Sequence, residues 1–139
     1  MHRPLSFALV AFILVAGATS GCDDADPPAG PSEPPPVEVS ETFPGRVTVN
    51  GAQTHSFPVT RAGSISARFG SLSGEGTVVG LSLGTWNGEV CALIITNDNA
   101  SAATTVPGTA TSLGSFCVRV YDVGRLTEAV DYEVVVTHF

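Results

Sequence analysis

A serine flanked by glycines is the pattern in this chain that most suggests catalysis. The segment GLSLG, residues 80–84, fits the G-x-S-x-G pattern of serine hydrolases, with Ser82 at its centre. That chemistry needs a sharp strand-to-helix turn that exposes the serine hydroxyl beside an oxyanion hole. The residues around Ser82 instead predict the interior of a β-strand, followed by another strand and not by a helix. We therefore expect no enzyme activity, and a hydrolase that uses Ser82 stays an alternative.

Three consecutive side chains that carry oxygen atoms form a second candidate site. The segment TNDNAS, residues 96–101, offers the carboxylate and amide oxygens that Ca²⁺ uses, with Asn97, Asp98 and Asn99 as candidate ligands. The other interpretation is that these side chains only stabilise a turn through hydrogen bonds to the backbone. We expect no metal and no other cofactor, with Ca²⁺ kept as the alternative.

The aromatic and histidine side chains form a third candidate group. Trp86, Tyr121 and Tyr132 are candidates for an aromatic face that stacks on sugar rings, the alternative being that they pack on neighbouring strands. His55 and His138 are expected at exposed strand positions, and the sequence places no third metal ligand beside them. The aromatic face is therefore the only ligand face that we predict, and the histidines predict no metal site.

The chain contains three cysteines. Cys91 and Cys117 both lie in apolar segments typical of strands, and in an oxidising compartment such a pair most simply forms a disulfide. The loop that this bond closes is long enough for a stabilisation of roughly 3 to 4 kcal/mol in the chain-entropy model. A metal or redox site, the alternative, lacks a Cys-x-x-Cys spacing and neighbouring histidines. We predict the disulfide, which leaves Cys22 as the odd cysteine.

Cys22 ends a segment that resembles the signal of bacterial lipoproteins. The apolar run from Leu5 to Ala18 is too short to span a bilayer as a helix, and small residues then lead to Gly21 and Cys22. The segment departs from that family at Thr19, where leucine is usual. The resemblance implies cleavage before Cys22, attachment of a diacylglyceryl group to its thiol, palmitate as an acyl chain, and anchoring of an exported protein to the cell envelope, at the inner or the outer membrane. The alternative is an ordinary secretory signal that leaves Cys22 as a free thiol.

Composition divides the chain into a signal peptide (residues 1–21), a linker (22–41) and one folded domain (42–139). The linker holds six of the ten prolines and six of the thirteen acidic residues, so it cannot form a core and favours extended conformations. The domain keeps seven acidic residues against five of the six arginines, and the chain has no lysine. A nearly neutral domain argues against nucleic acid as a partner. We expect a monomer that contacts the membrane through its lipid and an extracellular protein or glycan through its domain.

The folded domain is predicted to be all-β. Runs of valine, isoleucine, threonine and phenylalanine with period-two alternation recur about every ten residues, separated by glycine, asparagine, aspartate and proline. Seven or eight short strands over such a length are typical of an antiparallel β-sandwich. The expected strands are residues 43–49, 54–60, 64–71, 78–86, 89–97, 103–111, 115–123 and 131–138.

The Asn87-Gly88 dipeptide predicts a hairpin with a two-residue type I′ turn, because both positions of that turn need positive φ. The resulting register pairs Trp86 with Glu89, Leu83 with Ala92, Leu81 with Ile94 and Val79 with Thr96. It directs Val79, Leu81, Leu83, Val90, Ala92 and Ile94 to the core, and Ser82, Gly84, Trp86, Glu89, Cys91 and Leu93 outward. Alternation in SFCVRVYDV likewise directs Phe116, Val118 and Val120 inward and Cys117, Arg119 and Tyr121 outward. We therefore expect the two cysteine strands to be neighbours in one sheet, with the disulfide on its outer side.

A second Asn-Gly dipeptide, Asn50-Gly51, is predicted to lie in a loop of odd length. A two-residue turn would put Val47 and Val49 on the face opposite to Phe57 and Val59. A loop of three or five residues returns these four side chains to one face.

Four segments together resemble the bacterial pre-peptidase C-terminal (PPC) domain: VTVNGAQTHSFPVTRAGSISARF, VVGLSLGTWNGEVC, SFCVRVYDVG and DYEVVVTHF. The resemblance covers nearly all of residues 42–139 and implies a jelly-roll-like β-sandwich of the kind that accompanies secreted peptidases. No calcium or collagen motif of that family can be placed on these residues. We conclude that the sequence predicts a non-catalytic envelope lipoprotein displaying an interaction module of unknown ligand, the alternative being a structural envelope protein without a saturable ligand.

Overall fold

The computed structural model describes Gly30 and residues 34–139, so Cys22, the signal and most of the linker lie outside the described residues. The described part contains no helix long and apolar enough to cross a membrane. It forms eight strands, close to the predicted ranges, and the all-β prediction is confirmed. The strands are β1 (Val39–Val47), β2 (Ala52–Val59), β3 (Gly63–Leu72), β4 (Val79–Trp86), β5 (Cys91–Ala100), β6 (Thr105–Ala110), β7 (Gly114–Tyr121) and β8 (Val130–His138).

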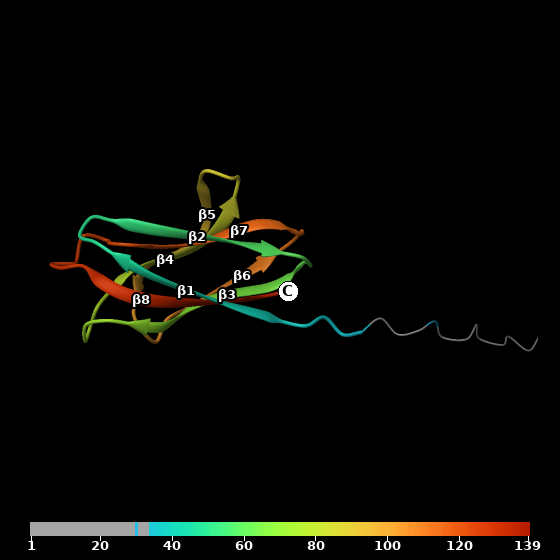
Figure 1. The fold of residues 1–139 in the computed structure, drawn as a ribbon, viewed down its shortest axis with the longest axis horizontal. Helices are drawn as coiled ribbons and strands as arrows, with labels where there is room; N and C mark the ends of the chain where they lie inside the picture. Colours follow the sequence, from blue (N-terminus) through green and yellow to red (C-terminus); the bar gives the residue numbers. More distant parts are fainter. Residues whose placement is uncertain (1–29, 31–33) are drawn as a thin grey trace, which may run out of the picture. The chain divides into compact units, whose positions relative to one another are not determined.

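The eight strands form two antiparallel four-stranded sheets that pack face to face as a sandwich (Figure 1). One sheet has the order β1-β8-β3-β6 and the other the order β2-β7-β4-β5. The chain changes sheet at every connection except the one between β4 and β5. This is the strand order of a jelly roll, which confirms the predicted architecture.

The core lies between the sheets and consists mostly of valines that alternate with outward-facing polar residues. In β8 every second residue is buried, because successive side chains of a strand point to opposite faces. The inward set predicted for β7 is also confirmed, since Val118 and Val120 are fully buried and Phe116 packs against the core. Val79, Leu81 and Leu83 of β4 are buried as expected.

Aromatic and histidine rings fill the core along the side where β1 and β2 form the sheet edges. His55 of β2 stacks on Phe43 of β1, and its Nε2 lies 2.8 Å from the Tyr132 hydroxyl on β8. This hydrogen bond joins the two sheets. Burial lowers the pKa of His55 below its ordinary value of 6.5 and raises the pKa of Tyr132 to about 12.

Three expectations about these side chains are wrong. His55, expected at an exposed strand position, is partly buried and contacts Phe43 and Tyr132. Tyr132 is 2 % exposed, so it belongs to the core and not to an outer aromatic face. Its position could have been read from the alternation Tyr132, Val134, Val136, since these residues share one face. His138 is also buried, with its ring stacked on Phe57 and its Nε2 at 2.9 Å from a Glu41 carboxylate oxygen.

The Asn50-Gly51 loop also differs from its prediction. Four residues, 48–51, connect β1 to β2, and these strands lie in different sheets, so the loop is not a hairpin. Gly51 N donates to Thr48 O at 2.8 Å, and Asn50 adopts the positive φ of 56° that a tight turn needs at this position. The Asn50 N–H also donates to the Asp122 carboxylate on the β7–β8 loop at 2.8 Å. A turn dipeptide marks the turn without telling which strands it joins.

The pair formed by the partly buried His55 and the buried Tyr132 predicts a loss of stability at both ends of the pH range. Above pH 10 the unfolded chain loses the tyrosine proton, whereas folded Tyr132 keeps it until about pH 12. The free energy of unfolding should therefore fall by about 2 to 3 kcal/mol as the pH rises from 10 to 12. As the pH falls below 6.5, the unfolded His55 imidazole takes up a proton that the folded one resists, so stability falls there too.

Urea unfolding over a series of pH values measures this dependence, and Tyr132→Phe is the control. The Phe variant should be less stable at neutral pH, because His55 loses its partner, by about 1 kcal/mol. Its free energy of unfolding should fall less between pH 10 and 12 than that of the wild type. An equal alkaline loss in both proteins would show that Tyr132 does not carry it.

Candidate functional site: the outer face of the β2-β7-β4-β5 sheet

Strand β4 presents only small residues on its outer face. Leu81 and Leu83 point into the core, and Gly80, Ser82 and Gly84 therefore point outward. These three are the residues of the G-x-S-x-G pattern. They form a narrow strip without bulky side chains, and side chains of the neighbouring strand β7 lie over it.

A disulfide crosses this strip and joins Cys117 of β7 to Cys91 of β5, which confirms the predicted pairing. The two strands are not neighbours, contrary to expectation, because β4 lies between them. Strands two positions apart are normally separated by about 9 to 10 Å, whereas the two cysteine Cα atoms are 5.8 Å apart. Strand β5 must therefore bend over β4. Both cysteines lie on the side away from the core, as predicted, and both are buried there.

Gly84 makes this bend possible. A methyl group on its Cα would overlap the carbonyl oxygen of Ala92 on β5, so only glycine fits where the two backbones approach each other. The ladder between β4 and β5 is also irregular here, because Leu83 pairs with Ile95 while Gly84 pairs with Leu93. Ile94 is thus the extra residue of a β-bulge.

A second bridge crosses the strip near Gly80, whereas the disulfide crosses it near Gly84. The Tyr121 side chain of β7 lies over Gly80 of β4, and its hydroxyl donates to the Asp98 carboxylate on β5. The Ser82 hydroxyl lies 3.4 Å from the Tyr121 oxygen and 3.3 Å from the Thr96 oxygen. Burial raises the pKa of Tyr121, and the hydrogen bond to Asp98 raises it further. Tyr121 is therefore neutral at physiological pH and acts as a hydrogen-bond donor.

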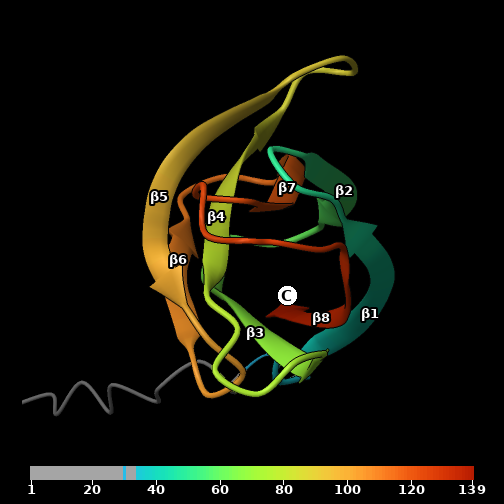
Figure 2. The ribbon, with the colours of Figure 1, turned by 90° about the vertical axis from the view of Figure 1, so that its left-hand side faces the viewer.

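The hairpin between β4 and β5 extends past these bridges as an arm, which we define as residues 85–94. Its turn stands clear of the other strands (Figure 2). The predicted type I′ turn and register are wrong, since Trp86 pairs with Cys91 and four residues, 87–90, form the loop. Only Gly88 has positive φ there, and the Asn87 side-chain oxygen accepts the backbone N–H groups of Glu89 and Val90 at 2.9 and 2.7 Å. Asn87 therefore stabilises the loop through its side chain.

The longer loop and the bulge change which residues of the arm are exposed. Val90, Ala92 and Ile94, expected in the core, are exposed, and Ile95 packs against the core in their place. Val90 is 59 % exposed and Ile94 67 % exposed. Each is a large apolar side chain that the fold leaves uncovered. The arm carries one charged residue, Glu89.

Arg119 of β7 lies at the centre of the same outer face, between Thr54 of β2 and Ser82 of β4. Its guanidinium carbon is 6.0 Å from the centre of the Tyr121 ring. Its Nε is buried, and no hydrogen-bond acceptor lies beside it. The sequence indicates the outward direction of Arg119, but no sequence pattern signals that its guanidinium lacks a partner.

The other residues predicted for a site are dispersed or already engaged. Ser82 lies inside a strand and is fully buried, without the exposed turn that a nucleophile needs. Asn97–Asn99 lie within β5, where Asp98 accepts the Tyr121 hydroxyl and Asn97 accepts the Asn99 N–H. Across the described residues no group of three His, Cys, Asp or Glu side chains is placed to hold a metal. Trp86 and Tyr121 belong to the outer face, and Tyr132 does not.

Comparisons with known proteins identify the fold. No protein-family model and no curated protein sequence matches the chain. The structure is similar to the crystal structure of the mitogen from Yersinia pseudotuberculosis, with a TM-score of 0.57 and 17 % identity over 74 % of this chain and 88 % of that chain. It is also similar to Aeromonas hydrophila PliG, a periplasmic inhibitor of g-type lysozyme, with a TM-score of 0.52 and 14 % identity over 70 % and 83 % of the two chains. At these identities the likeness shows a shared fold.

The strip of small residues predicts a specific energetic coupling between Gly80 and Tyr121. Gly80→Ala should lower the free energy of unfolding by about 1 to 3 kcal/mol, because the added methyl overlaps the Tyr121 ring. In a Tyr121→Ala background the same change should cost almost nothing, since the ring is gone. A double-mutant cycle measured by urea unfolding gives the coupling.

Gly84→Ala is the control for this cycle. Its added methyl meets the β5 backbone and not the Tyr121 ring, so its cost should be the same with and without Tyr121. A cost of Gly80→Ala that does not change in the Tyr121→Ala background would contradict the proposed arrangement.

Proposed function

We propose that this protein is a non-catalytic interaction module, exported and anchored to the cell envelope by a lipid on Cys22, and that the hairpin arm is its contact surface. The uncovered apolar side chains of the arm carry the proposal. Large apolar groups that a monomer leaves exposed together on a protruding element are typical of protein contact sites. The sequence before the domain, which resembles a lipoprotein signal and continues into an acidic, proline-rich linker, supports display at a membrane surface.

The arm has the rigidity that a contact surface needs. The Cys91–Cys117 bond ties it to β7, and the Asn87 side chain orders its turn. A surface held in one conformation loses less conformational entropy when a partner binds. Its apolar residues project from a stable sandwich, so the partner surface is concave and apolar, with a basic group where Glu89 approaches.

PliG provides a defined first partner to assay, because it shares the fold and is an inhibitor of g-type lysozyme. A soluble form of this protein is therefore worth adding to a g-type lysozyme assay. A decrease in lysis that Ile94→Asp abolishes would identify the enzyme class as the partner. Unchanged lysis would exclude this enzyme and direct the search to other envelope proteins.

The lipid anchor predicts a mass and a location. In the bacterium from which the gene comes, the mature protein should begin at Cys22, carry acyl chains and fractionate with membranes. Cys22→Ser should abolish incorporation of an alkyne-labelled palmitate and leave the disulfide intact, since Cys91 and Cys117 pair with each other. Intact mass, measured with and without reduction, checks both results. A wild-type protein without lipid that starts elsewhere would contradict the anchor.

The contact surface is tested by photo-crosslinking in intact cells. A benzophenone amino acid at Ile94 should give a discrete adduct with another protein, whereas the same group at Thr105 should not, because Thr105 is exposed on the other sheet. Glu89→Arg should weaken the Ile94 adduct if a basic group faces the arm. Equal adducts at both positions, or none at Ile94, would contradict the role of the arm.

A further inference from the structure

Arg119 is a guanidinium without an anionic partner on the outer face of the β2-β7-β4-β5 sheet. Within the part of the chain that the structure describes, Arg119 has no recognised ion pair with a carboxylate, and its buried Nε has no hydrogen-bond partner. Its guanidinium lies near the Tyr121 ring. Asp98, the acidic residue on this face, already accepts the hydrogen bond from Tyr121.

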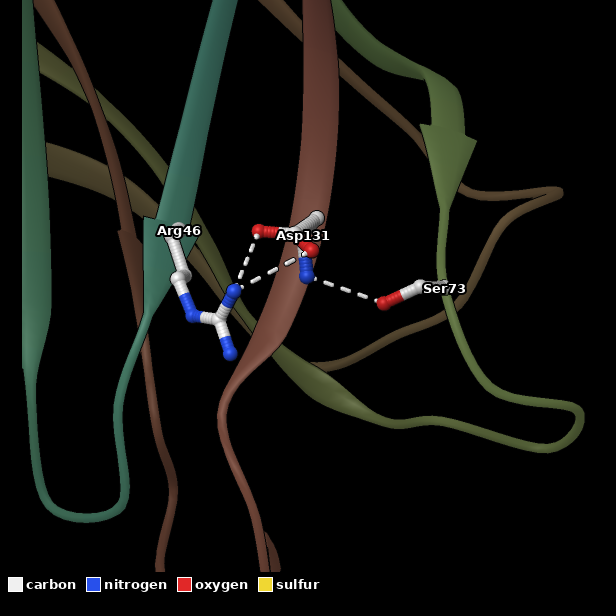
Figure 3. Close-up of polar contacts among 3 residues, drawn as sticks. All are labelled: Arg46, Ser73 and Asp131. Atoms are coloured by element: carbon white, nitrogen blue, oxygen red, sulfur yellow. Dashed lines mark hydrogen bonds and ion pairs between the residues drawn. The ribbon is translucent and has the colours of Figure 1, made fainter.

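Arg46 on the other sheet gives a comparison, because it has a carboxylate partner. Its Nη1 lies 3.4 and 3.5 Å from the two carboxylate oxygens of Asp131, directly across the β1–β8 ladder. The Asp131 backbone N–H donates to Ser73 Oγ at 2.9 Å, so Asp131 is itself held in place (Figure 3). Arg46 is well exposed, and Arg119 is not. The arginine that has lost more of its solvent is thus the one that lacks a partner.

A partly buried guanidinium with an unpaired N–H is unfavourable in the free protein. A buried donor without an acceptor costs on the order of 1 to 3 kcal/mol. The guanidinium as a whole also lacks an anion, and a carboxylate is the group that matches the planar fork of arginine.

The surroundings of Arg119 favour a sugar as the carrier of that carboxylate. On its β2 side lie the exposed hydroxyl groups of Thr54 and Ser56. On its β4 side lies the strip of Gly80, Ser82 and Gly84, which carries no large apolar side chain. The site thus offers one positive charge, several hydroxyl groups and an aromatic ring. A polyhydroxylated ring that bears a carboxylate can pair with the charge and form hydrogen bonds with the hydroxyl groups. We propose that Arg119 binds the carboxylate of an acidic sugar.

This inference goes beyond the proposed function, because it assigns a ligand to Arg119 on β7 and not to the apolar side chains of the arm. One ion pair with a few hydrogen bonds gives weak binding, with a Kd for a monosaccharide on the order of 1 mM. Binding should weaken as salt is raised, because the main attraction at the site is between charges.

The test is a titration of the full chain, labelled with ¹⁵N and held in detergent micelles, with sodium glucuronate. The side-chain Nε–H resonance of Arg119 is the readout, because its burial protects this proton from exchange with water. We expect this resonance to shift and saturate with glucuronate, and not to shift with glucose, which lacks the carboxylate. Saturation should be followed through backbone resonances of Thr54 and Ser82 as well.

Three variants and one further ligand make the outcome decisive. Arg119→Gln should abolish saturation. Arg119→Lys should weaken glucuronate binding at least tenfold, because lysine lacks the planar fork of arginine. Arg68→Gln removes the same charge from the other sheet and should leave glucuronate binding unchanged. Unchanged backbone resonances of the core would show that each variant is folded. Acetylglycine, a carboxylate without a sugar ring, should bind more weakly than glucuronate.

The results separate the two proposals. Absence of saturation with glucuronate, or equal binding of acetylglycine, would overturn the acidic-sugar site. The arm would still be supported as a contact surface if the Ile94 adduct persists in the Arg119→Gln protein. Loss of the adduct at Ile94 with retained glucuronate binding would overturn the arm and leave the sugar site.

Discussion

The arrangement of side chains on the outer face of this sheet depends on the small residues of β4. Because Gly80, Ser82 and Gly84 carry almost no side chain, strand β7 can reach strand β5 across a strand that separates them. One crossing is covalent, through Cys117 and Cys91, and the other is a hydrogen bond from Tyr121 to Asp98. A bulky residue in the strip would separate β5 from β7. The pattern that suggests a catalytic serine is therefore explained by packing.

The β4–β5 hairpin is where the jelly roll departs from a regular sandwich. Every other connection joins a strand of one sheet to a strand of the opposite sheet, so both sheets hold it in place. The β4–β5 connection stays in one sheet, and its free end would be expected to fray, because few contacts hold it. The disulfide and the Asn87 side chain oppose this. The bulge at Ile94 bends β5 over β4 and at the same time turns an apolar side chain outward.

Most of the fold could be predicted from the sequence because period-two alternation and turn residues act locally. The strand ranges, the sandwich and the Cys91–Cys117 bond needed only these patterns and the number of cysteines. The hairpin register was wrong because the loop has four residues where two were predicted, and because a bulge then shifts the pairing further. A turn dipeptide also cannot show whether its strands pair with each other. The lack of a carboxylate partner at Arg119 could not be predicted, because it depends on where acidic residues from distant segments lie in the fold. Tyr132 is a different case, since the alternation in β8 already places it with buried valines.

The disulfide acts differently on the unfolded chain and on the native arm. In the unfolded chain it closes a loop between residues 26 positions apart, which favours folding. In the folded protein β7 and β5 each pair with β4 already, so the bond adds little to the order of the sheet itself. What it adds is the position of the arm relative to Arg119, which is two residues from Cys117 on the same face of β7. A bond placed there fixes the base of the arm to β7, so the apolar side chains of the arm keep one position, and a surface held in one conformation loses less entropy when a partner binds.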